Sequence, residues 1–150
     1  QAPLYVDDAP SRSVSEIAAV GRRINQAESA KDNEKKKLGL IVIDYLQLIE
    51  PDNSKDPRQE QVAKIARRLK MMARQLEVPI LCLAQLNRQA EEGKDHTPKL
   101  SHLRESGAIE QDADVVMFVH REDYYLRGEE ADAARGKAQI IIAKQRNGPV

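Results

Sequence analysis

Short apolar segments alternate with longer amphipathic or polar segments along most of the chain. The clearest apolar segment, residues 40–43, has no polar alternation and is followed by Asp44. Such a run is typical of a central strand in a parallel sheet, where both faces of the strand are buried. Other β-prone or apolar runs of similar length also predict strands. The five predicted strands cover residues 4–6, 40–44, 80–84, 115–119 and 138–143.

A first helix is predicted between the first two strands, from Val14 to about Gln26. Ser13 and Glu16 are three residues apart, which is the spacing of a capping box at a helix start. Apolar residues then recur at the spacing that places them on one helical face. These residues are Val14, Ile17, Ala18, Gly21 and Ile24.

The second and longest helix is predicted after a loop at residues 51–57. Asp56 is the expected N-cap, Pro57 suits the first helical position, and Gln59 completes a capping box. Proline at position 79 disfavours helical backbone before it, so the helix ends there. Its expected buried positions are Val62, Ile65, Leu69, Met72, Ala73 and Leu76.

The order of strand, helix, strand, helix and strand predicts right-handed parallel crossovers. The last strands follow polar loops at 86–102 and 120–136, with one or two helical turns over 103–111, and suggest a meander. The expected fold is therefore α/β, with a mostly parallel sheet flanked by helices. Carboxyl ends of parallel strands share one edge, where open α/β sheets bind ligands. The polar groups expected at this edge are Asp7, Asp44 and Gln85.

The balance of charge narrows the possible partners. The 24 basic side chains equal the 24 acidic ones in number, so the net charge is zero. This argues against a general polyanion binder, and any contact with nucleic acid must come from a local patch. With only four tyrosines, one phenylalanine and no tryptophan, a base-stacking platform is not expected.

The single cysteine, Cys82, excludes a disulfide within the chain and fits a reducing compartment, so a cytoplasmic location is expected. No run of about 18 apolar residues is present, which predicts no membrane span. The first residues lack the pattern of a signal peptide and the chain does not begin with Met. We therefore expect a fragment or a processed product.

Several common catalytic motifs do not occur in residues 1–150. The phosphate-binding pattern G-x-x-x-x-G-K-[ST] is absent, because neither Gly-Lys pair, at 93–94 and 136–137, is followed by Ser or Thr. There is no G-x-G-x-x-G, no G-x-S-x-G and no metal-binding spacing of His and Cys. Hydrolase triads and structural zinc are thereby set aside.

Polar residues at the predicted strand ends remain as candidates. Asp44 has the position of a Walker B aspartate, which holds Mg²⁺ and a nucleotide phosphate through water, or it simply starts a turn. Gln85 can donate to a phosphate and accept from water, or it is an ordinary surface glutamine. Lys144 and Arg146 project the same way from an extended chain. They form either a phosphate clamp or an ordinary basic strand end.

Five segments taken together resemble the RecA-like motor domain of replicative hexameric DNA helicases of the DnaB type. Each is weakly specific alone, but their order and spacing are distinctive and they extend over nearly the whole chain. The resemblance implies a RecA-like P-loop NTPase core that uses ATP and Mg²⁺. The segments are Leu-Tyr-Val-Asp-Asp-Ala-Pro at 4–10, Leu-Ile-Val-Ile-Asp-Tyr-Leu-Gln-Leu-Ile at 40–49, Leu-Ala-Gln-Leu-Asn-Arg at 83–88, Leu-Arg-Glu-Ser-Gly-Ala-Ile-Glu-Gln-Asp-Ala-Asp at 103–114 and Ala-Lys-Gln-Arg-Asn-Gly-Pro at 143–149.

The resemblance also implies roles for the strand-end residues. Asp44 is similar to the Walker B aspartate, and Gln85 to the sensor that couples nucleotide state to the DNA-binding loops. Lys144 and Arg146 are similar to the pair that enters the ATP site of the neighbouring subunit in a homo-hexamer, Arg146 being the arginine finger. We therefore expect Asp44 and Gln85 on one edge of the sheet, and Arg146 directed away from its own core.

The channel loop of the family follows the phosphates of single-stranded DNA, and it corresponds here to Arg104, Glu105 and Gly107. Backbone tracking needs no aromatic platform, which agrees with the composition. The resemblance further implies a primase and a helicase loader as partners, and no membrane.

The chain departs from the family pattern because the Walker A loop, the catalytic glutamate and the N-terminal domain have no counterpart in residues 1–150. We expect the distal part of the C-terminal motor domain, unable to hydrolyse ATP alone. A RecA-like recombinase or other RecA-family ATPase is an alternative, against which residues 104–114 and 144–149 argue. A non-catalytic module for oligomerisation or DNA binding is another alternative for the fragment.

Overall fold

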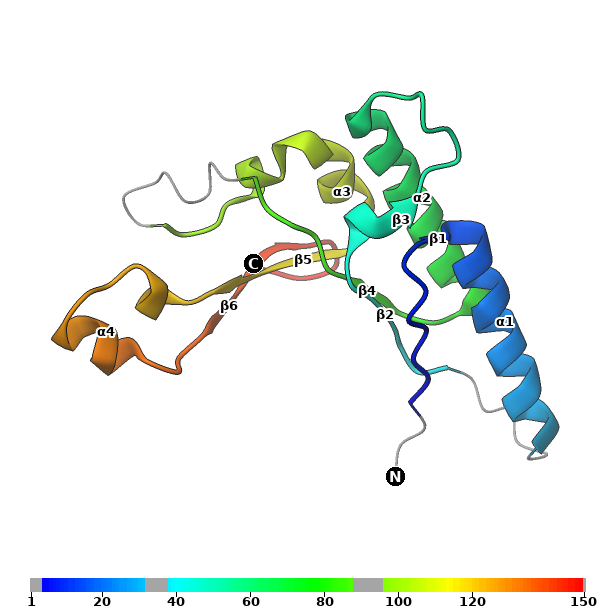
Figure 1. The fold of residues 1–150 in the computed structure, drawn as a ribbon, viewed down its shortest axis with the longest axis horizontal. Coiled ribbons are helices and arrows are strands. Elements are labelled where there is room, and N and C mark those ends of the chain that lie inside the picture. The colour runs from blue at the N-terminus through cyan, green and yellow to red at the C-terminus, as the bar shows by residue number, and fades with distance from the viewer. Residues whose placement is uncertain (1–3, 32–37, 88–95, 150) are drawn as a thin grey trace. The chain divides into compact units, whose positions relative to one another are not determined.

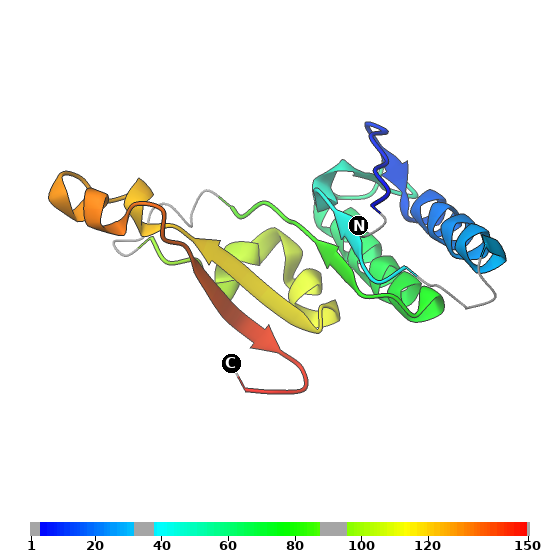
Figure 2. The ribbon, with the colours of Figure 1, turned by 90° about the horizontal axis from the view of Figure 1, so that it is seen from below.

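The structure, a computed structural model, describes residues 4–31, 38–87 and 96–149. The chain divides into two units, residues 1–85 and 86–150. The first unit contains β1 to β4 with α1 and α2, and the second contains α3, β5, α4 and β6 (Figures 1 and 2). Both units combine helices with short paired strands, as the α/β prediction requires.

In the first unit, β2 (Ile41–Ile43) and β4 (Ile80–Cys82) pair in parallel, with Ile41 opposite Ile80 and Ile43 opposite Cys82. Helix α2 (Arg58–Leu76) connects them in sequence and contacts β4. The predicted parallel crossover over these residues is therefore confirmed.

The stripe of apolar residues along α2 is buried as predicted, with Ala73 the one partly exposed member. Helix α1 (Val14–Lys31) lies beside α2, and both views of the ribbon show the two helices together (Figures 1 and 2). Burying one such side chain contributes about 1.5–3 kcal/mol. The buried side chains of α2 are Gln61, Val62, Ile65, Leu69, Met72 and Leu76.

Helix α1 begins where the capping box predicts. The Ser13 amide and hydroxyl both donate to Glu16 Oε2 at 2.8 Å, and the Glu16 amide donates to Ser13 Oγ at 3.3 Å. These hydrogen bonds hold the pKa of Glu16 below its ordinary value. The helix continues to Lys31, five residues beyond the predicted end, because residues 27–31 include the good helix formers Ala, Glu and Lys.

The predicted start of α2 is wrong in its capping residues. The helix begins at Arg58, and Asp56 makes no capping hydrogen bond because its carboxylate accepts from Lys64 Nζ at 2.8 Å and Asn53 Nδ2 at 2.6 Å. The buried side chain of Gln61 ties the loop to the helix instead. Its amide nitrogen donates to Asp56 O at 2.8 Å and to the carbonyl of residue 54 at 3.2 Å.

The predicted strand at residues 4–6 is also wrong. Leu4 and Val6 are 84% and 81% exposed, and no strand in the described part of the chain pairs with them. Residues with high β-propensity form a strand only where a neighbouring strand satisfies their backbone. The first strand is instead β1 (Arg12–Ser13), parallel to β3 (Ile49–Glu50).

The strands are covered on one face rather than two. In β2, Val42 is 57% exposed while Ile41 and Ile43 are partly buried. In β5 (Val115–His120), exposed and buried residues alternate strictly. The prediction that both faces of the strand at residues 40–43 are buried is therefore wrong, because the described residues pack against only one side of the β2–β4 pair.

The second unit is built on an antiparallel pair, β5 with β6 (Gln139–Gln145), as the predicted meander requires. A 3₁₀ helix (Leu100–Ser106) leads directly into α3 (Gly107–Asp112), close to the predicted helical turns. The excursion between β5 and β6 carries α4 (Glu129–Ala134), which lies beyond the end of the hairpin (Figure 1). The core contains Leu103, Val116 and Phe118, with Leu86, Leu100, Ala113, Ile141 and Ala143 against it.

Changing Gln61 to Ala should destabilise the fold by about 1–3 kcal/mol, because two carbonyls of the preceding loop lose their donor. Gln59→Ala is the matched control, since Gln59 is an exposed glutamine two residues earlier in the same helix and should change stability by less than about 0.5 kcal/mol. Urea unfolding of the 150-residue chain, followed by circular dichroism, measures both. Equal losses for the two variants would contradict the assignment of Gln61 as the tie.

Candidate functional site

The parallel pairing of β2 and β4 brings the ends of both strands to one edge. The Leu83 amide donates to Ile43 O at 2.9 Å, and the Leu46 amide donates to Leu83 O at 2.8 Å, so the two exits remain bonded beyond the strands. Asp44 directly follows β2, and Gln85 lies three residues after the end of β4. The carboxylate and the amide therefore belong to the same strand edge of the first unit.

Both predicted side chains at this edge are exposed, so each is available to a ligand. Gln47 also belongs here, although the sequence interpretation did not select it. The side-chain oxygen of Gln47 accepts a long hydrogen bond, 3.5 Å, from the backbone N–H of Gln85. The backbone carbonyl of Gln47 accepts from Arg58 Nη2 at 3.3 Å, which links the edge to the start of α2. The sequence could have pointed to Gln47, because it is a polar residue inside the mostly apolar run 45–49.

Asp7 does not join this edge, because residues 4–6 form no strand. Its carboxylate instead accepts from Arg12, with Nε–Oδ2 and Nη2–Oδ1 distances of 3.1 and 3.2 Å. These hydrogen bonds from Arg12 hold the pKa of Asp7 below its ordinary value, and one from the Ala9 amide adds to the effect. The predicted placement of Asp7 is wrong, and this residue has a local structural role.

The chemistry of the edge suits a phosphate ligand with a hydrated cation. Mg²⁺ keeps several waters and is held by one or two carboxylates together with substrate phosphates. Asp44 supplies one such carboxylate. Across the described ranges, no group of three or more His, Cys, Asp or Glu side chains could hold a metal by itself. Asp44 could therefore supply one carboxylate to such a cation, with the other ligands coming from elsewhere.

Lys144 and Arg146 belong to the second unit, where both contact the end of α3. Lys144 Nζ donates to the carbonyls of Glu110, Gln111 and Ala113, at 3.3 Å for Gln111 and 2.8 Å for Ala113. Arg146 Nη2 donates to Gln111 O at 2.6 Å. The pair therefore projects to one side, and it binds the carbonyls that a helix end leaves without partners.

Asp114 holds Arg146 at the end of the β5–β6 ladder. The Arg146 amide donates to Asp114 O at 2.8 Å, and Arg146 Nε lies 3.4 Å from Asp114 Oδ1. The Arg146 side chain is 49% exposed, so it is not packed into its own core. Lys144 lies inside β6 rather than past the strand, because the ladder extends to Gln145.

The predicted DNA-contact residues lie at the junction of the 3₁₀ helix and α3. Arg104 and Glu105 are in the 3₁₀ helix, and their side chains are outside the described part of the structure. Gly107 is the first residue of α3 and is exposed. The backbone turns at Leu103, which departs from helical geometry and anchors the segment in the core.

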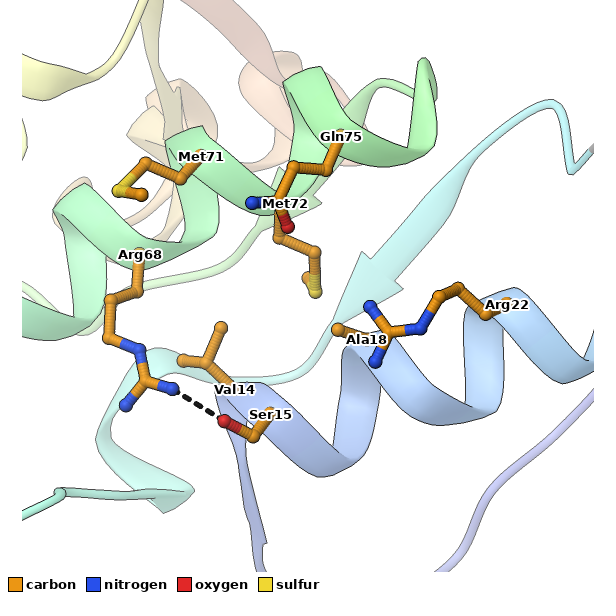
Figure 3. Close-up of a pocket in the computed structure, with 8 residues that line it drawn as sticks. All are labelled: Val14, Ser15, Ala18, Arg22, Arg68, Met71, Met72 and Gln75. Carbon is orange, nitrogen blue, oxygen red and sulfur yellow. Dashed lines mark hydrogen bonds between the residues drawn. The ribbon is translucent and has the colours of Figure 1, made fainter.

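A cavity of about 240 Å³ lies between α1 and α2, and none of the candidate residues lines it (Figure 3). Arg68 Nη2 donates to Ser15 Oγ at 2.6 Å across one end of it, as the dashed line in Figure 3 shows. Val14, Ala18 and Met72 also line it. Because both apolar and polar side chains of the two helices line it, we interpret this cavity as a packing gap between them.

Within the described ranges, no helix combines the length and the apolar character that crossing a bilayer requires.

A family model for the DnaB-like helicase C-terminal domain matches residues 1–150. The chain is 50% identical over 150 residues to the replicative DNA helicase DnaB of Geobacillus stearothermophilus, covering 99% of this chain and 31% of the relative. It is 49% identical over 148 residues to the replicative DNA helicase DnaC of Bacillus subtilis (strain 168), covering 98% and 30%. The chain thus spans about a third of the length of these relatives.

Two solved structures are similar to the chain. One is an ATPase domain, with a TM-score of 0.81 and 41% identity, covering 93% of this chain and 46% of that one. The other is a DnaB-like replicative helicase, solved with its interactions with primase, with a TM-score of 0.84 and 41% identity. It covers 95% of this chain and 32% of that one. These neighbours confirm the expected α/β ATPase fold, present in part.

Burial raises the pKa of the Cys82 thiol to about 11, because the charged thiolate loses hydration. The thiolate is the reactive form, so at pH 8 alkylation should be roughly 200-fold slower than for a cysteine of pKa 8.5. Mass spectrometry of the Cys82 peptide after iodoacetamide treatment, across pH 7–11, measures this. Urea-unfolded protein is the control, and a midpoint near pH 8.5 in the folded protein would contradict the burial.

Proposed function

The chain belongs to the family of DnaB-like helicase C-terminal domains, and on this premise we propose that it is the distal part of the motor of a replicative DNA helicase. This motor uses ATP to translocate on single-stranded DNA and to unwind duplex DNA during replication. The main support is the parallel β2–α2–β4 unit, with Asp44 and Gln85 at one strand edge. Helicases among the relatives favour this function over a recombinase.

At the strand edge, Asp44 acts as the Walker B aspartate and holds a hydrated Mg²⁺ beside the nucleotide phosphates. The cation supplies positive charge that stabilises the phosphates. Gln85 senses the nucleotide, because its uncharged amide can donate to a phosphate oxygen and accept from a water. The hydrogen bond from the backbone N–H of Gln85 to the side chain of Gln47 positions the backbone of this sensor residue.

Lys144 and Arg146 act on the ATP site of a neighbouring subunit in a homo-hexamer. Arg146 is the finger that neutralises charge on the transferring phosphate, and its half-exposed guanidinium supports this role. Residues 1–150 supply no Walker A loop. We therefore propose that the 150-residue chain does not hydrolyse ATP by itself and gains activity within a longer protein that also has an N-terminal domain.

The segment with Arg104, Glu105 and Gly107 lines the channel and follows the phosphates of single-stranded DNA. The position of Gly107 at the exposed start of α3 supports this role. A primase and a helicase loader are the proposed protein partners, and one structural relative was solved with primase. A cytoplasmic location belongs to the same proposal.

Changing Arg146 to Ala in the full-length protein should lower the kcat of ATP hydrolysis by roughly 10³-fold or more, while nucleotide affinity stays nearly constant. A finger acts on the transition state, so turnover falls more than binding. Steady-state ATPase assays and titration with a fluorescent ATP analogue measure the two quantities. Arg135→Ala is the control, since Arg135 is an exposed arginine of the same unit. Equal losses of affinity and turnover would count against a finger.

Changing Arg104 to Ala should weaken single-stranded DNA binding to a similar degree across sequences. Loss of one phosphate contact should flatten the slope of log affinity against log salt by about 0.7–1. Fluorescence anisotropy with poly-dT and mixed-sequence oligonucleotides, at several salt concentrations, measures this. Arg127→Ala, at an exposed arginine between β5 and α4, should behave as the parent. A loss confined to some sequences would be inconsistent with phosphate tracking.

A further inference from the structure

Lys144 uses its full hydrogen-bonding capacity on the end of α3. A lysine ammonium has three donors, and three backbone carbonyls accept from Lys144 Nζ, those of Glu110, Gln111 and Ala113. Hydrogen bonds to a charged donor are stronger than neutral ones. In this arrangement the ammonium has no N–H left for a phosphate.

Arg146 is bound differently, because it can keep its contacts within the second unit and still donate to a ligand. One terminal nitrogen of its guanidinium donates to Gln111 O, and Nε faces Asp114. A guanidinium has five N–H donors, so others remain for an incoming oxygen. Arg146 can therefore reach a phosphate while it stays attached to its own unit, whereas Lys144 cannot.

The contacts of Lys144 depend on an irregularity in β6. The register shifts between Val116 and Met117, which face Lys144 and Ile142, so Ala143 is the extra residue of a bulge. Ile141 and Ala143 pack on the core that lies beneath the 3₁₀ helix and α3. Regular alternation would direct Lys144 to the other face, and a bulge is the usual means of re-aiming such a side chain.

Helix α3 depends strongly on this cap. It has six residues, of which four are partly buried and none is fully buried, so side-chain packing alone holds it weakly. Isolated helices of this length are unstable in water. The side chains of Lys144 and Arg146 donate hydrogen bonds to its last carbonyls, and their positive charges interact favourably with the negative end of its dipole.

We propose that Lys144 is an exchangeable cap: it binds the end of α3 when the neighbouring ATP site is empty, and it leaves α3 to bind a phosphate there. This rests on the proposed function, in which Lys144 and Arg146 enter that site. One ammonium then serves two competing acceptors. Nucleotide in the neighbouring site loosens α3 and the segment before it, which contains Arg104.

Hydrogen–deuterium exchange of the full-length hexamer, with and without Mg²⁺ and a non-hydrolysable ATP analogue, tests the exchangeable cap. In the parent, amides of residues 108–114 should exchange at least about threefold faster when the analogue is bound. Lys144→Met keeps the length of the side chain but removes the cap. Its α3 should exchange fast in both states, so the effect of the analogue disappears.

Lys137→Met is the matched control, because Lys137 is an exposed lysine just before β6, and it should retain the response of the parent. Unchanged or slower exchange of α3 in the analogue-bound parent would overturn the proposal, as would slow exchange in Lys144→Met. Analogue binding and the turnover of Arg146→Ala, measured on the same preparations, separate the two hypotheses. If Arg146→Ala loses turnover but α3 of the parent does not respond to the analogue, only the exchangeable cap is refuted. If Arg146→Ala keeps its turnover, the proposed finger is refuted.

Discussion

The parallel pairing of β2 with β4 is the constraint on which the strand edge depends. Each strand has only three residues, and a ladder this short is not stable by itself. Helix α2 supplies the missing stability, because its apolar stripe is buried and it contacts both α1 and β4. Burial on the helix thus helps to hold the two strands together. Their parallel direction in turn decides that Asp44 and Gln85 leave the sheet at the same end.

This hierarchy explains which parts of the fold could be predicted from the sequence. The apolar period of α2 and the capping box at Ser13 are local patterns, and both are confirmed. The cap of α2 could not be predicted because Asp56 has competing partners, Lys64 and Asn53, that only the folded loop brings near. Residues 4–6 have strand propensity, but propensity does not reveal whether a pairing partner exists.

The candidate site shows the same division between local and long-range information. Sequence order alone placed Asp44 and Gln85 at strand ends, since parallel strands share their carboxyl edge. The spacing of Lys144 and Arg146 indicated a common direction, and their contacts with α3 agree with it. Sequence could not reveal what they contact, because the bulge at Ala143 and the carbonyls of α3 are set by tertiary packing. Their proposed roles toward ATP came from the resemblance and not from periodicity.

A cation at a strand end can satisfy backbone carbonyls or bind a phosphate, and the chemistry of the two side chains separates these uses. The planar guanidinium of Arg146 has donors in several directions, so it can bridge its own helix and a ligand. The compact ammonium of Lys144 concentrates all its donors at one point, so binding one group fully excludes another. A Lys-x-Arg pair therefore combines a permanent anchor with a mobile one. The order of the two residues places the mobile one inside β6, where it binds the carbonyls of Glu110, Gln111 and Ala113 at the end of α3.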